Sequence, residues 1–121
     1  MTEKLYTYIF TRQDLSPEQQ IVQSSHAAMQ LGYELGLRPP EEASTQFITS
    51  FCANPSDVHF IIVGVRNVES LLGVKQILKK NNFEYEIFFE PADGGQPTSI
   101  AVYPVEESKK GPLLAFNLLR V

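Results

Sequence analysis

The chain has 121 residues, of which 43% are hydrophobic and 20% are charged, and its formal net charge is −4. These values fit one domain over residues 1–121 that buries a sizeable core, and they argue against a disordered chain. The acidic balance also argues weakly against broad nucleic-acid affinity, because phosphate binding depends on clustered Lys and Arg side chains.

Membrane and metal chemistry are not expected either. No apolar run approaches the roughly 20 residues of a membrane-spanning helix, and the first residues, MTEKLYTYIF, lack the pattern of a secretory signal. We therefore expect a cytoplasmic protein that has no membrane partner. The single Cys52 cannot form an internal disulfide, and no Cys/His group has zinc-ligand spacing, so we predict no metal and no cofactor.

The first two elements are a strand and a helix that meet at a short polar corner. The near-continuous apolar run Leu5–Thr11 predicts a buried, central strand. The helix runs from Pro17 to about Leu35, with Ser16 as its N-cap and Gln19 at the third position of a capping box. In α/β proteins such a strand-to-helix corner usually carries the chemistry.

Small side chains predict the face of this helix that lies close to the sheet. Ser25, Ala28 and Gly32 follow helical spacing, together with the larger apolar residues Ile21, Val22, Met29 and Leu35. A second helix is predicted over Pro40–Cys52, which begins with proline and has acidic residues in its first turn.

The second half of the chain alternates between strand and helix patterns. The predicted elements are a buried, central strand Val58–Val65, a helix Val68–Lys80 capped by Asn67, a half-buried strand Phe83–Phe89 and a strand Thr98–Val105. A short, turn-rich connection makes the last two strands antiparallel. The run Leu113–Leu119 is either an edge strand or a short helix, and its hairpin-like spacing favours the strand.

This order predicts an α/β fold with a mixed sheet of four or five strands and with helices packed on it. No internal repeat, linker or low-complexity segment is present in the sequence.

Two segments resemble signatures of the type II peptidyl-tRNA hydrolase family, the archaeal and eukaryotic type. The first is Arg12-Gln13-Asp14-Leu15 followed by Gln23-Ser24-Ser25-His26-Ala27-Ala28, and the second is Thr98-Ser99-Ile100-Ala101-Val102-Tyr103-Pro104. The resemblance implies the family's single-domain fold and a metal-independent role in translation. The implied reaction is hydrolysis by water of the ester between a peptide and tRNA.

The resemblance also implies a site. Thr98 matches the family's threonine, and Asp93 is the nearest candidate for its aspartate, with Glu90 as the alternative. Gln19 stands where family members usually carry a lysine, so a cation is replaced by a neutral amide. Asp93, Thr98 and Gln19 are the candidate catalytic residues, and the candidate substrate-binding residues are Arg12, Asp14, His26 and Gln96.

Structural roles compete with these assignments. Gln19 can serve as the capping-box partner of Ser16, Arg12 and Asp14 can form a mutual ion pair, and His26 can be hydrogen-bonded structure. Asp93 begins a sequence typical of an ordinary turn. At the level of function, two alternatives to the hydrolase are an inactive binding protein on the same fold and a self-associating module, with a possible homodimer formed through an edge strand.

Overall fold

The computed structural model describes residues 4–39, 58–91 and 94–115. The predicted helix Pro40–Cys52 and the residue Asp93 lie outside the described residues. No described helix has the length and apolar character needed to span a membrane.

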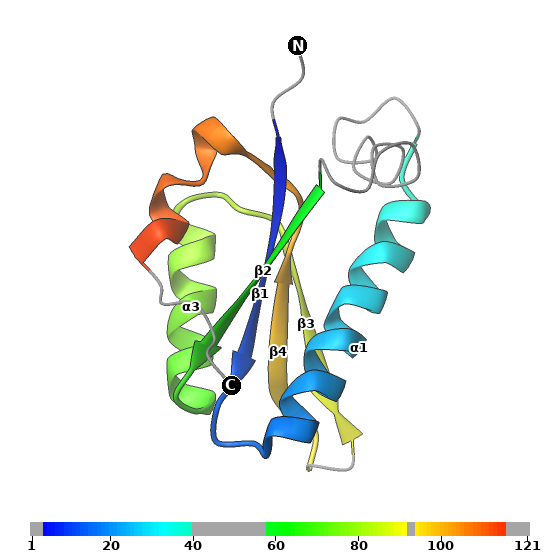
Figure 1. Ribbon diagram of the computed structural model, residues 1–121, viewed down its shortest axis with the longest axis vertical. Coiled ribbons are helices and arrows are strands. Elements are labelled where there is room, and N and C mark those ends of the chain that lie inside the picture. Colours follow the sequence, from blue (N-terminus) through cyan, green and yellow to red (C-terminus); the bar gives the residue numbers. More distant parts are fainter. Residues whose placement is uncertain (1–3, 40–57, 92–93, 116–121) are drawn as a thin grey trace.

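The described residues form an α/β domain around a mixed five-stranded sheet, as predicted (Figure 1). The four main strands lie in the order β2-β1-β4-β3, and the short β5 pairs with the first residues of β1. Their bounds are β1 Leu5–Arg12, β2 Val58–Val65, β3 Tyr85–Glu90, β4 Gln96–Val102 and β5 Val105–Glu106. β1 is parallel to β2 and antiparallel to β4, and β3 is antiparallel to β4. The central place predicted for the first strand is confirmed. The central place predicted for Val58–Val65 is wrong, because β2 is the end strand of this order and its Phe60 is 44% exposed.

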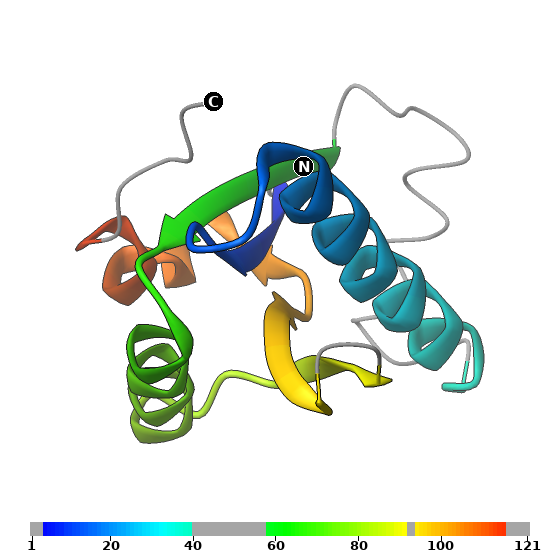
Figure 2. The ribbon, with the colours of Figure 1, turned by 90° about the horizontal axis from the view of Figure 1, so that it is seen from below.

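Two helices cover opposite faces of this sheet, α1 (Pro17–Gly36) and α3 (Val68–Lys80), as Figures 1 and 2 show. Alternation along the strands divides the core between these faces. On the α1 side the buried residues are Ile9, Ala27, Leu31, Leu35, Ala101 and Tyr103. On the α3 side they include Tyr8, Phe10, Leu71, Val74, Leu78, Ile100 and Val102.

The predicted start of α1 is confirmed, but its predicted buried face is correct only for Leu35 and, in part, for Ala28. Ser16 accepts a hydrogen bond from the Gln19 backbone N–H at 3.2 Å, which is the expected N-cap. Ser25 and Gly32, however, are exposed. The face that contacts the sheet is instead Gln20, Gln23, Ala27, Leu31 and Leu35. A polar pair at the start of the helix therefore belongs to the buried stripe, which a purely apolar pattern does not reveal.

The C-terminal prediction also needs correction. Leu113 lies in a 3₁₀ helix, Gly111–Ala115, and not in the favoured strand. Its side chain is buried on the α3 side of the sheet, and its N–H donates to the Lys110 carbonyl at 2.8 Å. Pro112, which has no N–H to donate to a strand, precedes it. Residues 113–115 therefore cannot supply the edge strand proposed for self-association, and residues 116–119 lie outside the described residues.

Candidate active site

Hydrogen bonds of Arg12 connect the corner between β1 and α1 to the beginning of β4. Arg12 binds both carboxylate oxygens of Asp14, at 2.9 Å through Nε and at 2.8 Å through Nη2. Its Nη1 also donates to the Pro97 carbonyl oxygen at 3.3 Å. The hydrogen bonds from Arg12 lower the pKa of Asp14 below its usual value. The structure thus shows the mutual ion pair of Arg12 and Asp14. Through its bond to Pro97, Arg12 also connects the β1–α1 corner to the start of β4, 85 residues away in the sequence.

A β-bulge turns Thr98 toward α1. In the β3–β4 ladder Phe88 lies opposite Ser99, and Phe89 lies opposite Pro97, so Thr98 has no partner in the ladder. Simple alternation would place Thr98 on the α3 side with Ile100, but its hydroxyl donates to the Gln23 side chain on α1 at 2.8 Å. Bulges commonly re-aim side chains in this way beside active sites.

From Thr98 a chain of hydrogen bonds runs from the core to the surface. Gln23, which is 2% exposed, accepts from Thr98 through Oε1 and donates through Nε2 to Glu90 Oε2 at 3.0 Å. Glu90 ends β3, and 21% of its side chain is exposed. Because the Thr98 hydroxyl donates to Gln23 Oε1, the Nε2 side of the amide must face Glu90. The Gln23 amide therefore holds the Glu90 carboxylate in one orientation.

Two further predicted residues lie beside this chain. The Oε1 atom of Gln19 accepts a weaker hydrogen bond from Gln23 Nε2 at 3.4 Å. The Gln19 side chain thus faces the site, whereas its backbone N–H makes the cap to Ser16. His26 Nδ1 lies 4.0 Å from Glu90 Oε2, and its ring stacks at a tilt on Phe88 with 4.8 Å between ring centroids. The site therefore gathers Gln19, Gln23 and His26 of α1 around one carboxylate.

The connection between β3 and β4 brings Glu90 to this position. Gly94 and Gly95 both have positive φ, 71° and 75°, and the Gly95 N–H donates to the Glu90 carbonyl at 3.1 Å. Glycine adopts such angles at little cost. Gln96, a predicted substrate-binding residue, begins β4, is exposed and lies opposite Glu90 in the ladder.

These residues offer a partly exposed carboxylate with a hydrogen-bonded support. Thr98 is 1% exposed, so in this structure it acts on the surface only through Gln23. Sequence reasoning assigned no role to Gln23, although Gln23 opens the quoted helix motif. The signal that could have found it is the spacing of Gln20 and Gln23 with Ala27, Leu31 and Leu35, which places two amides on one apolar stripe.

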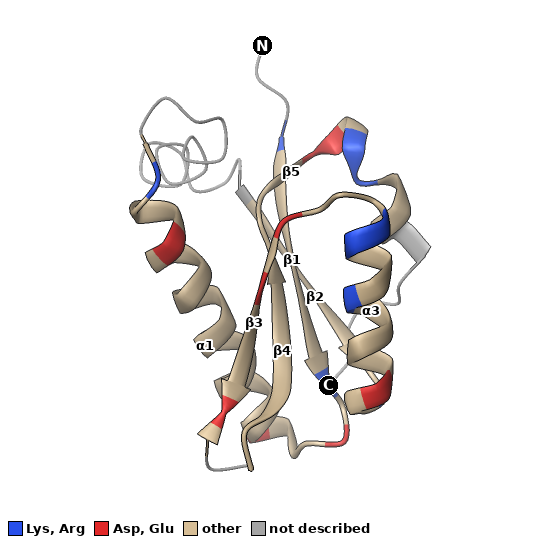
Figure 3. Cartoon of the chain, turned by 180° about the vertical axis from the view of Figure 1, so that it is seen from behind, with Lys and Arg blue, Asp and Glu red and all other residues tan. Residues whose placement is uncertain are grey.

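The charges of the described residues are unevenly distributed (Figure 3). Basic residues of α3 lie toward the end of the sheet that carries β5, away from the carboxylate of Glu90 at the end of β3. Among the described residues, no group of three His, Cys, Asp or Glu side chains could hold a metal ion.

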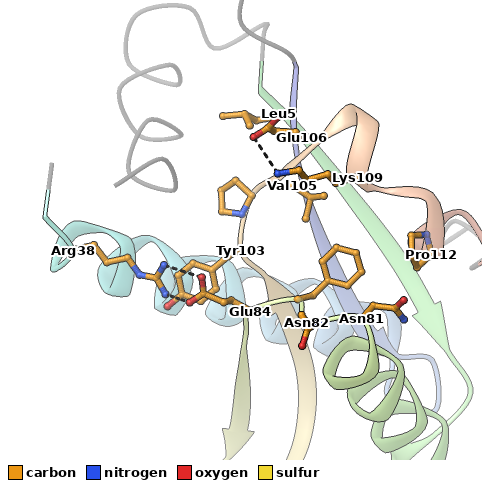
Figure 4. Close-up of a pocket in the computed structure, with 12 residues that line it drawn as sticks. Leu5, Arg38, Asn81, Asn82, Glu84, Tyr103, Val105, Glu106, Lys109 and Pro112 are labelled. Atoms are coloured by element: carbon orange, nitrogen blue, oxygen red, sulfur yellow. Dashed lines mark hydrogen bonds and ion pairs between the residues drawn. The ribbon is translucent and has the colours of Figure 1, made fainter. Parts of the chain in front are cut away.

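A larger pocket of about 690 Å³ lies at the other end of the sheet (Figure 4). Arg38 lines it, forms an ion pair with Glu84 at 2.6 Å and lies over the Tyr103 ring, with its Cζ atom 4.0 Å from the ring centroid. None of the predicted site residues lines this pocket. Gln19 and His26, which the motifs single out, lie around Gln23 and Glu90 instead, so the candidate site is assigned there and not to this pocket.

No protein-family model matches this chain, and no curated protein matches its sequence. The roles assigned to these side chains depend on their geometry and on the motifs that resemble the hydrolase family.

Proposed function

We propose that the protein hydrolyses the ester between a peptide and tRNA, with water as the nucleophile and Glu90 as the general base. The observation that carries this proposal is the hydrogen-bonded chain Thr98–Gln23–Glu90. This chain connects Thr98, from the motif on β4, and Gln23, from the motif on α1, to the carboxylate of Glu90. Such support is what a positioned base requires, because proton transfer depends on geometry before it depends on pKa.

In the proposed reaction Glu90 takes a proton from water while the water oxygen attacks the ester carbonyl carbon. The carbonyl oxygen becomes an oxyanion in a tetrahedral intermediate. The bond to the ribose oxygen then breaks, and that oxygen receives the proton from Glu90. The products are the free peptide acid and the ribose hydroxyl of tRNA. Gln23 and Thr98 act as positioning residues, since neither needs to touch the substrate.

Gln19 supplies the second requirement, a donor for the oxyanion. Its Oε1 already accepts from Gln23, which leaves its Nε2 hydrogens to face a substrate. Arg12 is a poorer candidate, because the residue is 6% exposed and its guanidinium is hydrogen-bonded to Asp14 and to the Pro97 carbonyl. A neutral donor in place of a cation implies a slow enzyme, since loss of such an oxyanion contact typically costs about 100- to 1,000-fold in rate.

The test is release of free peptide from N-acetyl-aminoacyl-tRNA by the purified protein. We expect Glu90→Gln to abolish the release above the buffer rate, with Glu69→Gln on α3 as the matched control at wild-type rate. An Asp93→Asn variant tests the alternative carboxylate. Loss of activity in Asp93→Asn with full activity in Glu90→Gln would transfer the base role to Asp93. No release by the wild-type protein would refute the hydrolase.

One observation favours a second candidate, a binding protein that kept the scaffold without the reaction. The neutral Gln19 stands where the family usually carries a cation, and its Oε1 accepts a hydrogen bond from Gln23. This candidate predicts that the protein binds N-acetyl-aminoacyl-tRNA without turnover. An electrophoretic mobility shift with no peptide release would support it over the hydrolase.

A further inference from the structure

An apolar groove of about 460 Å³ lies directly beside the candidate site. It is lined by His26, Met29, Gln30 and Tyr33 of α1 and by Phe88 of β3. The four helical residues have i, i+3, i+4 and i+7 spacing, so they form one face of the helix. His26 belongs both to the groove and to the surroundings of Glu90, from which its Nδ1 lies 4.0 Å away. The groove is therefore continuous with the proposed base.

The chemistry of this groove suits an uncharged, apolar ligand. Met29 is 77% exposed and Tyr33 is 59% exposed, so two large side chains of the groove are open to a ligand. Helix α1 contains no Lys or Arg. Gln30 Nε2 donates to an acid, Glu86, whose Oε2 accepts at 3.5 Å. Such a surface repels phosphates and attracts the acyl part of an ester.

The length of the groove fits a short extended peptide. Tyr33 follows His26 by seven positions, so the groove extends about 10 Å along the helix. This is the length of about three residues in a β-conformation. The adjacent strand β3 forms the edge of the sheet and pairs, among the described residues, with β4 alone. An edge strand offers main-chain hydrogen-bonding groups to an extended peptide whatever its sequence.

We infer that this groove binds the last three or so residues of the peptide in the ester, with the ester carbonyl at Glu90 and the preceding residues extending toward Tyr33. The inference rests on the proposed function, because the hydrolase supplies the ester. It adds a substrate class: acyl groups that are extended and apolar are preferred over single or polar ones. The main chain binds along β3, and apolar side chains bury against Met29 and Phe88.

Binding can be tested without turnover, because the chain has only two methionines. Protein labelled with ¹³C in the methionine methyl groups is titrated with N-acetyl-Leu-Leu-Leu-amide and, as a control, with N-acetyl-Gly-Gly-Gly-amide. We expect a saturable shift of the Met29 methyl signal with the leucine peptide and a much smaller shift with the glycine peptide. Assignment comes from the signal that disappears in Met29→Glu. An absent shift, or equal shifts, would overturn the inference.

Hydrolysis gives the second readout. N-acetyl-Leu-Leu-Leu-tRNA should be cleaved with kcat/KM roughly tenfold or more above that of the triglycyl ester, from the apolar area that leucine buries. Met29→Glu should remove this preference. Ile21→Glu, which changes a residue of α1 that is 63% exposed and outside the groove, should keep it.

The outcomes separate the two proposals. Equal efficiencies for both esters in the wild-type protein would support the hydrolase and overturn the groove assignment. A saturable Met29 shift without hydrolysis of either ester would refute the hydrolase and support the groove as a peptide site. Equal loss of the preference in Ile21→Glu and Met29→Glu would overturn the groove assignment, since the effect would not be local.

Discussion

Replacing Thr98 with valine tests the hydrogen-bonded chain that carries the proposed function. Valine has almost the shape of threonine, so Thr98→Val creates no cavity. It removes the hydroxyl that donates to Gln23 Oε1 at 2.8 Å. Because Gln23 is 2% exposed, water cannot readily replace that donor. An unsatisfied buried acceptor costs about 1–3 kcal/mol of unfolding free energy.

Urea unfolding measures this loss of unfolding free energy, and a double-mutant cycle assigns it to the Thr98–Gln23 pair. With a typical urea m-value of about 2 kcal/mol per molar, Thr98→Val should lower the unfolding midpoint by roughly 1 M. The double variant Thr98→Val with Gln23→Met should be less destabilised than the sum of the two single variants, because it leaves no buried amide oxygen without a donor. A Thr98→Val variant within about 0.5 kcal/mol of wild type, or a double variant equal to the sum of the single variants, would refute the reasoning.

Three further predictions concern charge and pH. Gln19→Lys should raise kcat for N-acetyl-aminoacyl-tRNA about 100- to 1,000-fold by stabilising the oxyanion; an unchanged rate in a steady-state assay would remove Gln19 from the site. Asp14→Asn should destabilise the protein at neutral pH, and its difference from wild type in urea unfolding should shrink as the pH falls below 3.8, the usual value, through the lowered pKa of Asp14. A difference that stays constant down to pH 2 would contradict the pairing with Arg12. Burial, followed by the hydrogen bond to Glu86, raises the pKa of Tyr103 from 10.0 to about 12, so its hydroxyl stabilises the fold below pH 10 and loses that effect as the pH rises toward 12. Unfolding of Tyr103→Phe should therefore depend less on alkaline pH than that of wild type, and identical pH profiles would argue against this account.

Much of the sheet could be predicted because its strands are locally apolar. The apolar runs Leu5–Thr11 and Val58–Val65 both predicted strands, and they form a parallel pair, with β1 inside the sheet and β2 at the end of its strand order. The helix N-caps Ser16 and Asn67 could also be predicted, because each side chain accepts a hydrogen bond from the backbone N–H of the residue three positions later. These features depend on residues close together in the sequence.

The features that failed depend on distant partners. The bulge at Thr98 arises from the register between β3 and β4, which no local pattern contains. The buried role of Gln23 depends on Thr98 and Glu90, which lie 75 and 67 residues away. The exposed face of α1 looked like a core stripe because Met29 and Ile21 are apolar, although both face outward.

The candidate site was only partly foreseeable for the same reason. Thr98, Gln19 and His26 were named from motifs. The structure links Thr98 and Gln19 through Gln23 to Glu90, the alternative carboxylate, and places His26 Nδ1 4.0 Å from it. The proposed catalytic role of Asp93 stays a prediction, as do cytoplasmic location and self-association.

The three linked side chains between β4 and the surface have a polarity. Every donor points the same way, from Thr98 through Gln23 to Glu90, so the only formal charge sits at the outer end. Each link strengthens the next while that charge is present. Protonation of Glu90 would therefore also weaken the hydrogen bond between Gln23 and the buried Thr98 hydroxyl. Any change that neutralises this carboxylate, whether acid or a bound cation, would weaken the hydrogen bonds that join α1 to the sheet.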